Sequence, residues 1–348
     1  MQLNPKKTNR LASYCIFDKY GVVDDYVFAY LKDLKKNVKD IIITVNGKLQ
    51  PEFRTRLEEF GQVFVRKNEG LDVAAHKEAI LRVGFDKLAE YDEIILQNDT
   101  LFGPVYPLAK TFEKMARMDL DFWGLTKYYH EEPVRKNVHP KGYIPEHINT
   151  SFLVCRTSLV NAPEFRKYWK KMPIYKYYMD VVNFHEAVFT KHFENLGFKW
   201  STSVETDQVQ KKGLHYPLMQ QPLELVEKLR CPVFKRRLFF HEPAGYFAYS
   251  VGDAPVKLLK YLQQRTNYNT DLVYKNIIRT LNPYVLTKNL GLFKSLPKHL
   301  VKSSAQSVPK QRVALVMHSY FTDLVPYLLK YATNMPEDAD IYVTTGSQ

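Results

Sequence analysis

Strand-length apolar runs alternate with stretches of helical periodicity along the first 125 residues, and this alternation constrains the fold of the chain most. Strands are predicted near residues 11–17, 40–45, 63–66, 93–97 and 121–125, and helices near 24–36, 51–59, 73–89 and 104–118. Such β-α alternation is typical of a mostly parallel sheet with helices on both faces. We therefore expect an α/β, Rossmann-like fold.

The pattern changes after this region. Residues 126–150 are rich in His, Pro, Lys and Gly and predict a long loop over the sheet edge, which at this length favours a functional role. A further strand is predicted at 151–155, followed by helices near 163–171 and 178–196.

The composition of the chain changes from residue 288 onward, and this change predicts a domain boundary. Residues 1–287 are expected to form one domain, and 288–311 a basic linker, which is either a solvated tether or a segment whose charge contacts anionic lipid. Residues 312–348 contain one strand-helix-strand pattern, too short to bury its own core. We expect the beginning of a second α/β domain, apparently truncated.

The net charge of +13 and the pI near 9.3 favour polyanionic partners, anionic membrane or phosphorylated ligands. Nucleic acid is not the expected partner, because no zinc-ligand set or RNA-binding aromatic motif accompanies the charge. The three widely spaced cysteines fit a reducing cytoplasm. No apolar run reaches the roughly 18 residues of a membrane span, so any contact with the inner face of the cell membrane is expected to be peripheral.

Two predicted strands end in short polar segments. Asn98, Asp99 and Thr100 follow the strand at 93–97, and a loop with Asn68, Gly70 and Asp72 follows the strand at 63–66. Ligands of open α/β sheets bind beyond the carboxyl ends of the strands. We expect two adjacent strands to deliver these residues to one site.

The residue types suggest a phosphate-bound metal. Asp99, with Asn98, is predicted to hold Mg²⁺ or Mn²⁺ on a diphosphate, because hard oxygen ligands and substrate phosphates suit these ions. The alternative is that Asp99 or Thr100 caps the helix behind Gly103-Pro104. Asp72 either contacts a ribose or base, or caps the helix expected from Val73, with Asn68 and Gly70 shaping the turn.

Four motifs in this order resemble the rhamnan synthesis protein F family over roughly residues 10–250: Asn68-x-Gly70-x-Asp72, Gln97-Asn98-Asp99-Thr100-Leu101-Phe102-Gly103-Pro104, Asp121-Phe122-Trp123-Gly124-Leu125-Thr126 and His147-Ile148-Asn149-Thr150-Ser151-Phe152. The resemblance implies a bacterial glycosyltransferase of the GT-A type. It would move rhamnose or a related sugar, with inversion, from a nucleotide diphosphate donor such as dTDP-rhamnose to a cell-envelope polysaccharide or lipid-linked glycan.

The sequence departs from the family pattern in two places. Asn149-Thr150-Ser151 replaces a Gln-Ser-Tyr-like run, which leaves the sugar and the acceptor open. The aspartate-any-aspartate triplet usual for metal binding in GT-A enzymes is absent from the strand end at Asn98-Asp99-Thr100, so Asp99 is the single carboxylate offered there as a metal ligand.

The family resemblance places an acidic residue at His185-Glu186, and Glu186 is the first candidate for the general base, with Asp180 in reserve. A glutamate on an amphipathic helix is otherwise usually solvated or paired. A zinc motif on the same helix is excluded, because Phe189 stands where His-Glu-x-x-His needs its second histidine.

Five further residues are candidate contacts, each with a structural alternative. Asp18 follows the first strand, where GT-A folds place nucleotide contacts, and is otherwise a turn former. Trp123 is predicted to stack on a sugar or to pack in the core. His147 is predicted to contact donor or acceptor, and Lys235 and Arg236 a diphosphate, unless they belong to a surface charge run.

These observations together favour a glycosyltransferase, and the family resemblance alone implies that it is inverting. The runner-up is a non-catalytic glycan- or nucleotide-binding module that uses the same sheet edge. A basic nucleic-acid binder, with affinity that falls steeply with salt, ranks last.

Overall fold

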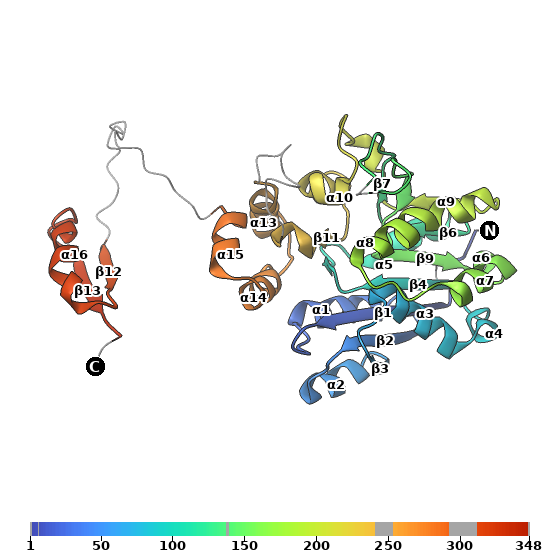
Figure 1. Ribbon diagram of the computed structural model, residues 1–348, viewed down its shortest axis with the longest axis horizontal. Helices are drawn as coiled ribbons and strands as arrows, with labels where there is room; N and C mark the ends of the chain where they lie inside the picture. The colour runs from blue at the N-terminus through green and yellow to red at the C-terminus, as the bar shows by residue number, and fades with distance from the viewer. Residues whose placement is uncertain (1, 6, 137–138, 241–252, 292–311, 347–348) are drawn as a thin grey trace. The chain divides into compact units, whose positions relative to one another are not determined.

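The computed structural model describes residues 2–5, 7–136, 139–240, 253–291 and 312–346, and it divides into two compact units, 1–293 and 294–348. Unit 1 is built on a seven-stranded sheet (Figure 1). In spatial order its strands are β10 (Trp200–Thr202), β6 (Phe122–Gly124), β9 (Phe152–Arg156), β4 (Glu93–Asn98), β1 (Arg10–Asp18), β2 (Asp40–Gly47) and β3 (Gln62–Arg66). All neighbouring pairs are parallel except those made by β9, which is antiparallel to β4 and to β6.

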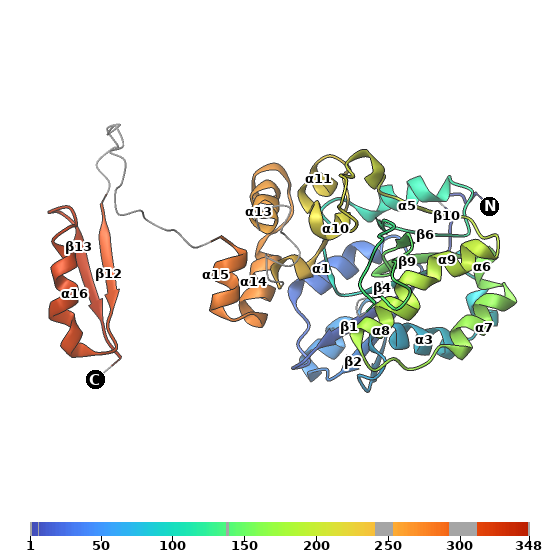
Figure 2. The ribbon, with the colours of Figure 1, turned by 45° about the horizontal axis from the view of Figure 1, so that its top comes forward.

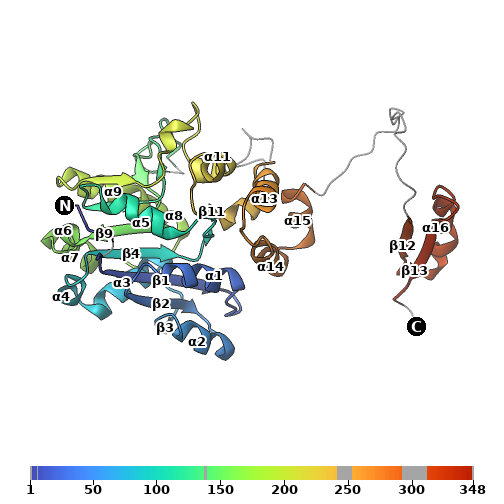
Figure 3. The same ribbon diagram turned by 180° about the vertical axis from the view of Figure 1, so that it is seen from behind.

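Helices cover both faces of this sheet, because strand residues alternate between two cores. Ala12, Tyr14 and Ile16 of β1 belong to the core under α1 (Asp25–Leu34), α2 (Pro51–Glu58) and α5 (Leu108–Ala116), which Figure 3 shows from behind. Leu11 belongs to the core on the opposite face. Six helices lie along that opposite face: α3 (Leu71–Val83), α4 (Phe85–Leu88), α6 (Thr157–Val160), α7 (Pro163–Lys171), α8 (Tyr178–Val181) and α9 (Ala187–Asn195).

A buried glutamate ties the central strands together. Glu93 of β4 accepts from Arg10 Nε of β1 at 2.6 Å and from Arg156 Nε of β9 at 3.2 Å, and Trp123 Nε1 of β6 donates to it at 3.0 Å. Arg10 and Arg156 are also its register partners in β1 and β9. A one-residue slip would separate these buried charges, so the ion pairs help to specify the register.

The expected α/β fold with helices on both faces of a mostly parallel sheet is thus confirmed, with local differences. The helix expected at 73–89 begins at Leu71 and breaks at Gly84 into α3 and α4. The helix expected from residue 104 begins only at Leu108, behind Pro107. The stretch expected at 178–196 contains a π-helical turn, η1 (Val182–Glu186), between α8 and α9.

The long loop predicted at 126–150 carries a small hairpin, in which β7 (Lys127–Tyr128) pairs antiparallel with β8 (His147–Ile148). Further along the chain, β11 (Phe234–Lys235) pairs antiparallel with β5 (Leu101–Phe102). The remaining elements of unit 1 are η2 (Thr206–Gln208), α10 (Pro217–Gln220), α11 (Pro222–Glu227), η3 (Arg236–Phe239), α13 (Ala254–Arg265), α14 (Asp271–Thr280) and α15 (Pro283–Asn289). Figure 2 shows α13, α14 and α15 gathered near α1.

Unit 2 contains the expected strand, helix and strand: β12 (Ala314–His318), η4 (Thr322–Leu324), α16 (Val325–Ala332) and β13 (Asp340–Thr344), with the two strands parallel. In its described part only Ser319 and Ala332 are buried. Whether this unit begins a second domain stays a prediction. Most of the expected linker, from residue 292 onward, lies outside the described residues. Among the residues that are described, no helix has the length and apolar character needed to cross a membrane.

Candidate functional site

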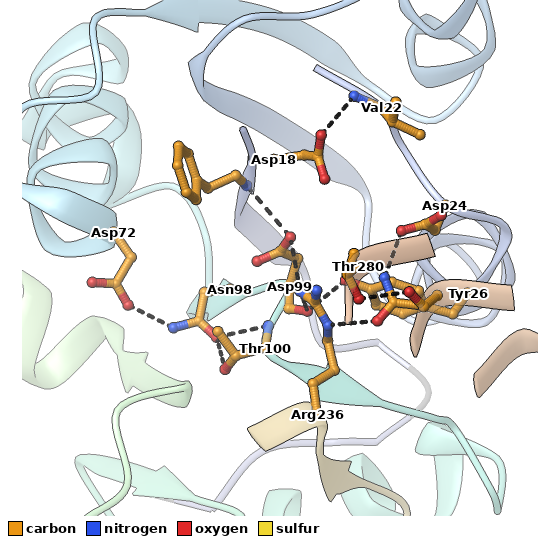
Figure 4. Close-up of polar contacts among 12 residues, drawn as sticks. Asp18, Val22, Asp24, Tyr26, Asp72, Asn98, Asp99, Thr100, Arg236 and Thr280 are labelled. Carbon is orange, nitrogen blue, oxygen red and sulfur yellow. Dashed lines mark hydrogen bonds and ion pairs between the residues drawn. The ribbon is translucent and has the colours of Figure 1, made fainter. Parts of the chain in front are cut away.

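The two polar loops do converge, although their strands are not neighbours as we expected. In the sheet, β1 and β2 lie between β4 and β3. The loops meet because α3, which starts at the end of the second loop, packs back on β1 and β2 and brings Asp72 towards the end of β4. Asn98 Nδ2 donates to Asp72 Oδ2 at 2.5 Å (Figure 4).

The capping alternatives have different outcomes. The N-cap of α3 is Gly70 and not Asp72, but Asp72 lies in the first turn and its Oδ1 accepts from Val73 N at 2.9 Å. The N-cap of α5 is Pro107, and Leu108 N donates to Asp33 at 3.0 Å, so neither Asp99 nor Thr100 caps that helix. Thr100 instead donates through Oγ1 to Asn98 Oδ1 at 2.5 Å.

Gly70 allows the chain to turn into α3. Its φ is +74°, and a Cβ built there would lie 2.5 Å from Cβ of Ala74, so a larger residue is excluded by strain and by contact. Asn68 is exposed in the preceding turn.

The pairing of β5 with β11 brings two basic residues to the end of β4. These residues, Lys235 and Arg236, stand more than 130 positions after Asp99 and Thr100 in the sequence. Lys235 Nζ donates to Thr100 Oγ1 at 3.2 Å. Arg236 Nη1 donates to the backbone oxygen of Asp99 at 3.2 Å and lies 3.5 Å from its Oδ2 (Figure 4). These cations belong to the site and not to a surface charge run.

Asp99 lies at the base of this arrangement and is 7% exposed. Phe17 N donates to its Oδ2 at 3.4 Å, and Tyr26 donates to its backbone oxygen at 2.8 Å. Burial raises the pKa of Asp99 to about 6, against the opposing effects of Arg236 and of the Phe17 amide; the carboxylates of Asp72 and Asp18 raise it further. The group therefore ionises close to neutral pH.

Glu186 approaches the site from the face of the sheet that α3 covers. It is the last residue of η1, and π-helical turns are frequent at functional sites. Its side chain is partly exposed and makes no hydrogen bond with the described residues. Burial lowers the pKa of Lys235 to about 8, an effect opposed by the carboxylates of Glu186 and Asp72. Glu186 thus lies within electrostatic reach of Lys235.

His147 also lies near Glu186. Burial lowers its pKa, and the Glu186 carboxylate opposes that shift. The ring stacks on Tyr128 with centroids 5.2 Å apart, and Nδ1 lies 2.7 Å from the carbonyl oxygen of Pro145. The hairpin that carries His147 is therefore packed against the Glu186 side of the site.

Asp18 forms the turn after β1, as the structural alternative predicts, and its carboxylate also acts on the pKa of Asp99. Its Oδ1 accepts from Tyr20 N at 2.8 Å and from Val22 N at 3.1 Å, and its Oδ2 pairs with Arg279 of α14 at 2.7 Å. Arg279 pairs with Asp24 as well, at 2.6 Å. Sequence reasoning missed Arg279 and Asp24, because no motif surrounds either and only the packing of α14 against α1 joins them.

Two candidate residues do not reach the cluster. Trp123 is fully buried between the rings of Phe112 and Phe152, so the expectation that it stacks on a sugar is wrong and the core-packing alternative holds. Asp180 of α8 is partly exposed and acts, together with burial, to raise the pKa of Tyr175.

The fold and the site together define an α/β protein with carboxylates and cations at the carboxyl ends of its strands, where such sheets bind phosphorylated ligands. The model of the rhamnan synthesis protein F family matches residues 41–348, and the chain belongs to this family.

A curated relative, the uncharacterized protein y4gN of Sinorhizobium fredii, is 23% identical over 202 residues. The match covers 58% of this chain, which spans only half the length of that relative. Among solved structures, the apo-form glycosyltransferase GlyE of Streptococcus pneumoniae is 11% identical, with a TM-score of 0.37, over 98% of this chain and 76% of that chain.

Proposed function

We propose that the chain is an inverting glycosyltransferase that uses a nucleotide diphosphate sugar and elongates an envelope polysaccharide or lipid-linked glycan. Membership of a rhamnan synthesis family supports rhamnose as the sugar and dTDP-rhamnose as the donor. The observation that carries the proposal is that Lys235 and Arg236 contact Thr100 and Asp99 at the carboxyl end of β4, while the Glu186 carboxylate acts on the pKa of Lys235.

Lys235 and Arg236 would bind the diphosphate. Both are partly exposed, and their donors converge on Thr100 and Asp99 at the strand end. Charge-assisted hydrogen bonds to phosphate oxygens would stabilise the negative charge that develops on the leaving group.

Asp99 would be the protein ligand of a divalent ion such as Mg²⁺ or Mn²⁺. No group of three or more His, Cys, Asp or Glu side chains in the described part of the chain is arranged to hold a metal. Asp99 Oδ1 makes no hydrogen bond with the described residues, however, and Mg²⁺ in phosphate sites often takes one or two carboxylates with the substrate oxygens. When bound, the ion would neutralise diphosphate charge.

Glu186 would act as the general base. The oxygen of an acceptor hydroxyl attacks the anomeric carbon, its proton passes to the Glu186 carboxylate, and the bond to the donor oxygen breaks with its electron pair on the diphosphate. His147 lies beside Glu186 and would position the acceptor or the donor sugar.

The test is nucleotide release from a panel of nucleotide sugars, with and without EDTA. With the active donor, Glu186→Gln should lower kcat by about 10²–10⁴-fold, the usual range for loss of a general base. Asp180→Asn on the neighbouring helix is the matched control and should retain turnover. Asp99→Ala should lose turnover, and an effect of EDTA would support the metal.

The competing outcome is a non-catalytic glycan- or nucleotide-binding module. It would show ligand binding without nucleotide release, and Asp99→Ala would then keep most of the glycan affinity.

A further inference from the structure

We propose that α7 and the segment that follows it dock unit 1 on an anionic membrane surface. This basic-aromatic surface consists of Lys167, Lys171, Ile174, Lys176, Tyr177 and Phe184. It is separate from the expected basic linker and is formed entirely by described residues.

The three large apolar side chains of this surface are exposed within eleven residues of the chain, from Ile174 to Phe184. Ile174 is 63% exposed and Tyr177 is 70% exposed, and Phe184 is half exposed in η1. A groove of about 420 Å³ adjoins them, lined by Tyr175 and Phe184 together with Met172 and Leu196. Amphipathic rings and aliphatic chains beside a polar rim are typical of surfaces that enter the headgroup region of a bilayer.

The charge of this region favours an anionic partner over a neutral apolar one. Residues 163–184 contain five Lys or Arg residues and two acids, a net charge of +3. Lys167, Lys171 and Lys176 are exposed and make no hydrogen bond or ion pair with the described residues. Each lysine near an anionic lipid surface strengthens binding, and its methylene stem can lie along the apolar contact.

The surface borders the candidate site. A Cβ at Gly70 would lie 3.1 Å from Ile174 Cγ2, so Ile174 is next to the start of α3 and hence near Asp72. Tyr178, the residue after Tyr177, accepts from Arg237 Nη1 at 2.6 Å, beside Arg236. A membrane contact at this surface would hold the Glu186 side of the site close to the headgroups, where a lipid-linked acceptor would be presented.

Flotation of the full chain with vesicles tests the proposal. Vesicles of phosphatidylglycerol and phosphatidylcholine should bind the protein, and vesicles of phosphatidylcholine alone should not. The triple change Lys167→Glu, Lys171→Glu and Lys176→Glu should weaken binding at least about tenfold, given the contribution of each lysine. Ile174→Ser with Tyr177→Ser should weaken the binding that remains at about 0.3 M salt, where charge is more strongly screened.

A charge-matched control separates this surface from the overall charge of the chain. Lys39→Glu, Lys110→Glu and Lys228→Glu change three exposed lysines of unit 1 outside it. Equal losses in the two triple variants, or full binding by the surface variants, would overturn the proposal. So would a concentration-dependent dimer that the surface variants abolish without any change in vesicle binding. Thermal melts check folding, and the assay uses no sugar nucleotide, so its outcome is independent of the transferase proposal.

Discussion

At the scale of single residues, Asp99 links folding to pH. Burial raises its pKa to about 6, against an ordinary value of 3.8. Between about pH 4 and pH 6 the folded chain therefore holds a proton that the unfolded chain has released, and the free energy of unfolding falls as the pH rises through this window. The loss is on the order of 2 kcal/mol and persists above the window.

Asp99→Asn removes this titration. Relative to the unchanged protein, the variant should be more stable at pH 7.5 than at pH 4.5, by on the order of 2 kcal/mol in urea unfolding. Other groups that titrate, among them His76 and His185, contribute equally to the pH dependence of variant and parent, so their contributions cancel in the comparison. Asp86→Asn is the control, because the Asp86 side chain is 95% exposed. Its free energy of unfolding should differ from that of the parent by the same amount at both pH values. A pH-independent difference for Asp99→Asn would show that its carboxyl group is not shifted.

At the scale of elements, α14 is held to the carboxyl end of β1 by Arg279. The guanidinium pairs with Asp18 and Asp24, whose side chains are only 13% and 12% exposed. Arg279→Ala would remove this guanidinium from two carboxylates that are largely buried. The change should lower the free energy of unfolding by roughly 1–3 kcal/mol. Hydrogen exchange should accelerate in α14.

Lys275 on the same helix supplies the control. Both Lys275 and its ion-pair partner Asp25 have exposed side chains. Lys275→Ala should therefore lower the free energy of unfolding by less than about 0.5 kcal/mol. Equal small effects of both changes in urea unfolding would show that α14 is held by its apolar contacts, such as Val273 and Ile277, rather than by Arg279.

At the scale of the whole molecule, unit 1 contains all the residues of both hydrophobic cores. Removal of residues 294–348 should therefore leave a folded protein with a Tm within about 2 °C of the full chain, since roughly 1 kcal/mol corresponds to a few degrees at this size. Calorimetry of the two chains checks this. A shortened chain that unfolds well below the full one would make unit 2 part of the same cooperative structure.

Local patterns in the sequence were sufficient for the α/β class and for the polar strand ends. The run Glu93–Asn98 is apolar and ends in polar residues, which identifies both a buried strand and its functional end. The order of the strands within the sheet was not predictable from such local patterns. We took the strands before Asn68 and Asn98 as neighbours, whereas β1 and β2 separate them, because strand order depends on crossover connections and not on local composition.

The sequence by itself determined which residue types stand at the ends of β1, β3 and β4, since apolar periodicity and turn residues are local properties of the chain. Only the tertiary structure decided which of them act together. The pairing of β5 with β11 and the packing of α14 on α1 bring Lys235, Arg236 and Arg279 to Asp99 and Asp18. Tertiary packing also buries Trp123 between Phe112 and Phe152, and burial raises the pKa of Asp99, because these surroundings arise from contacts between residues that are far apart in the chain.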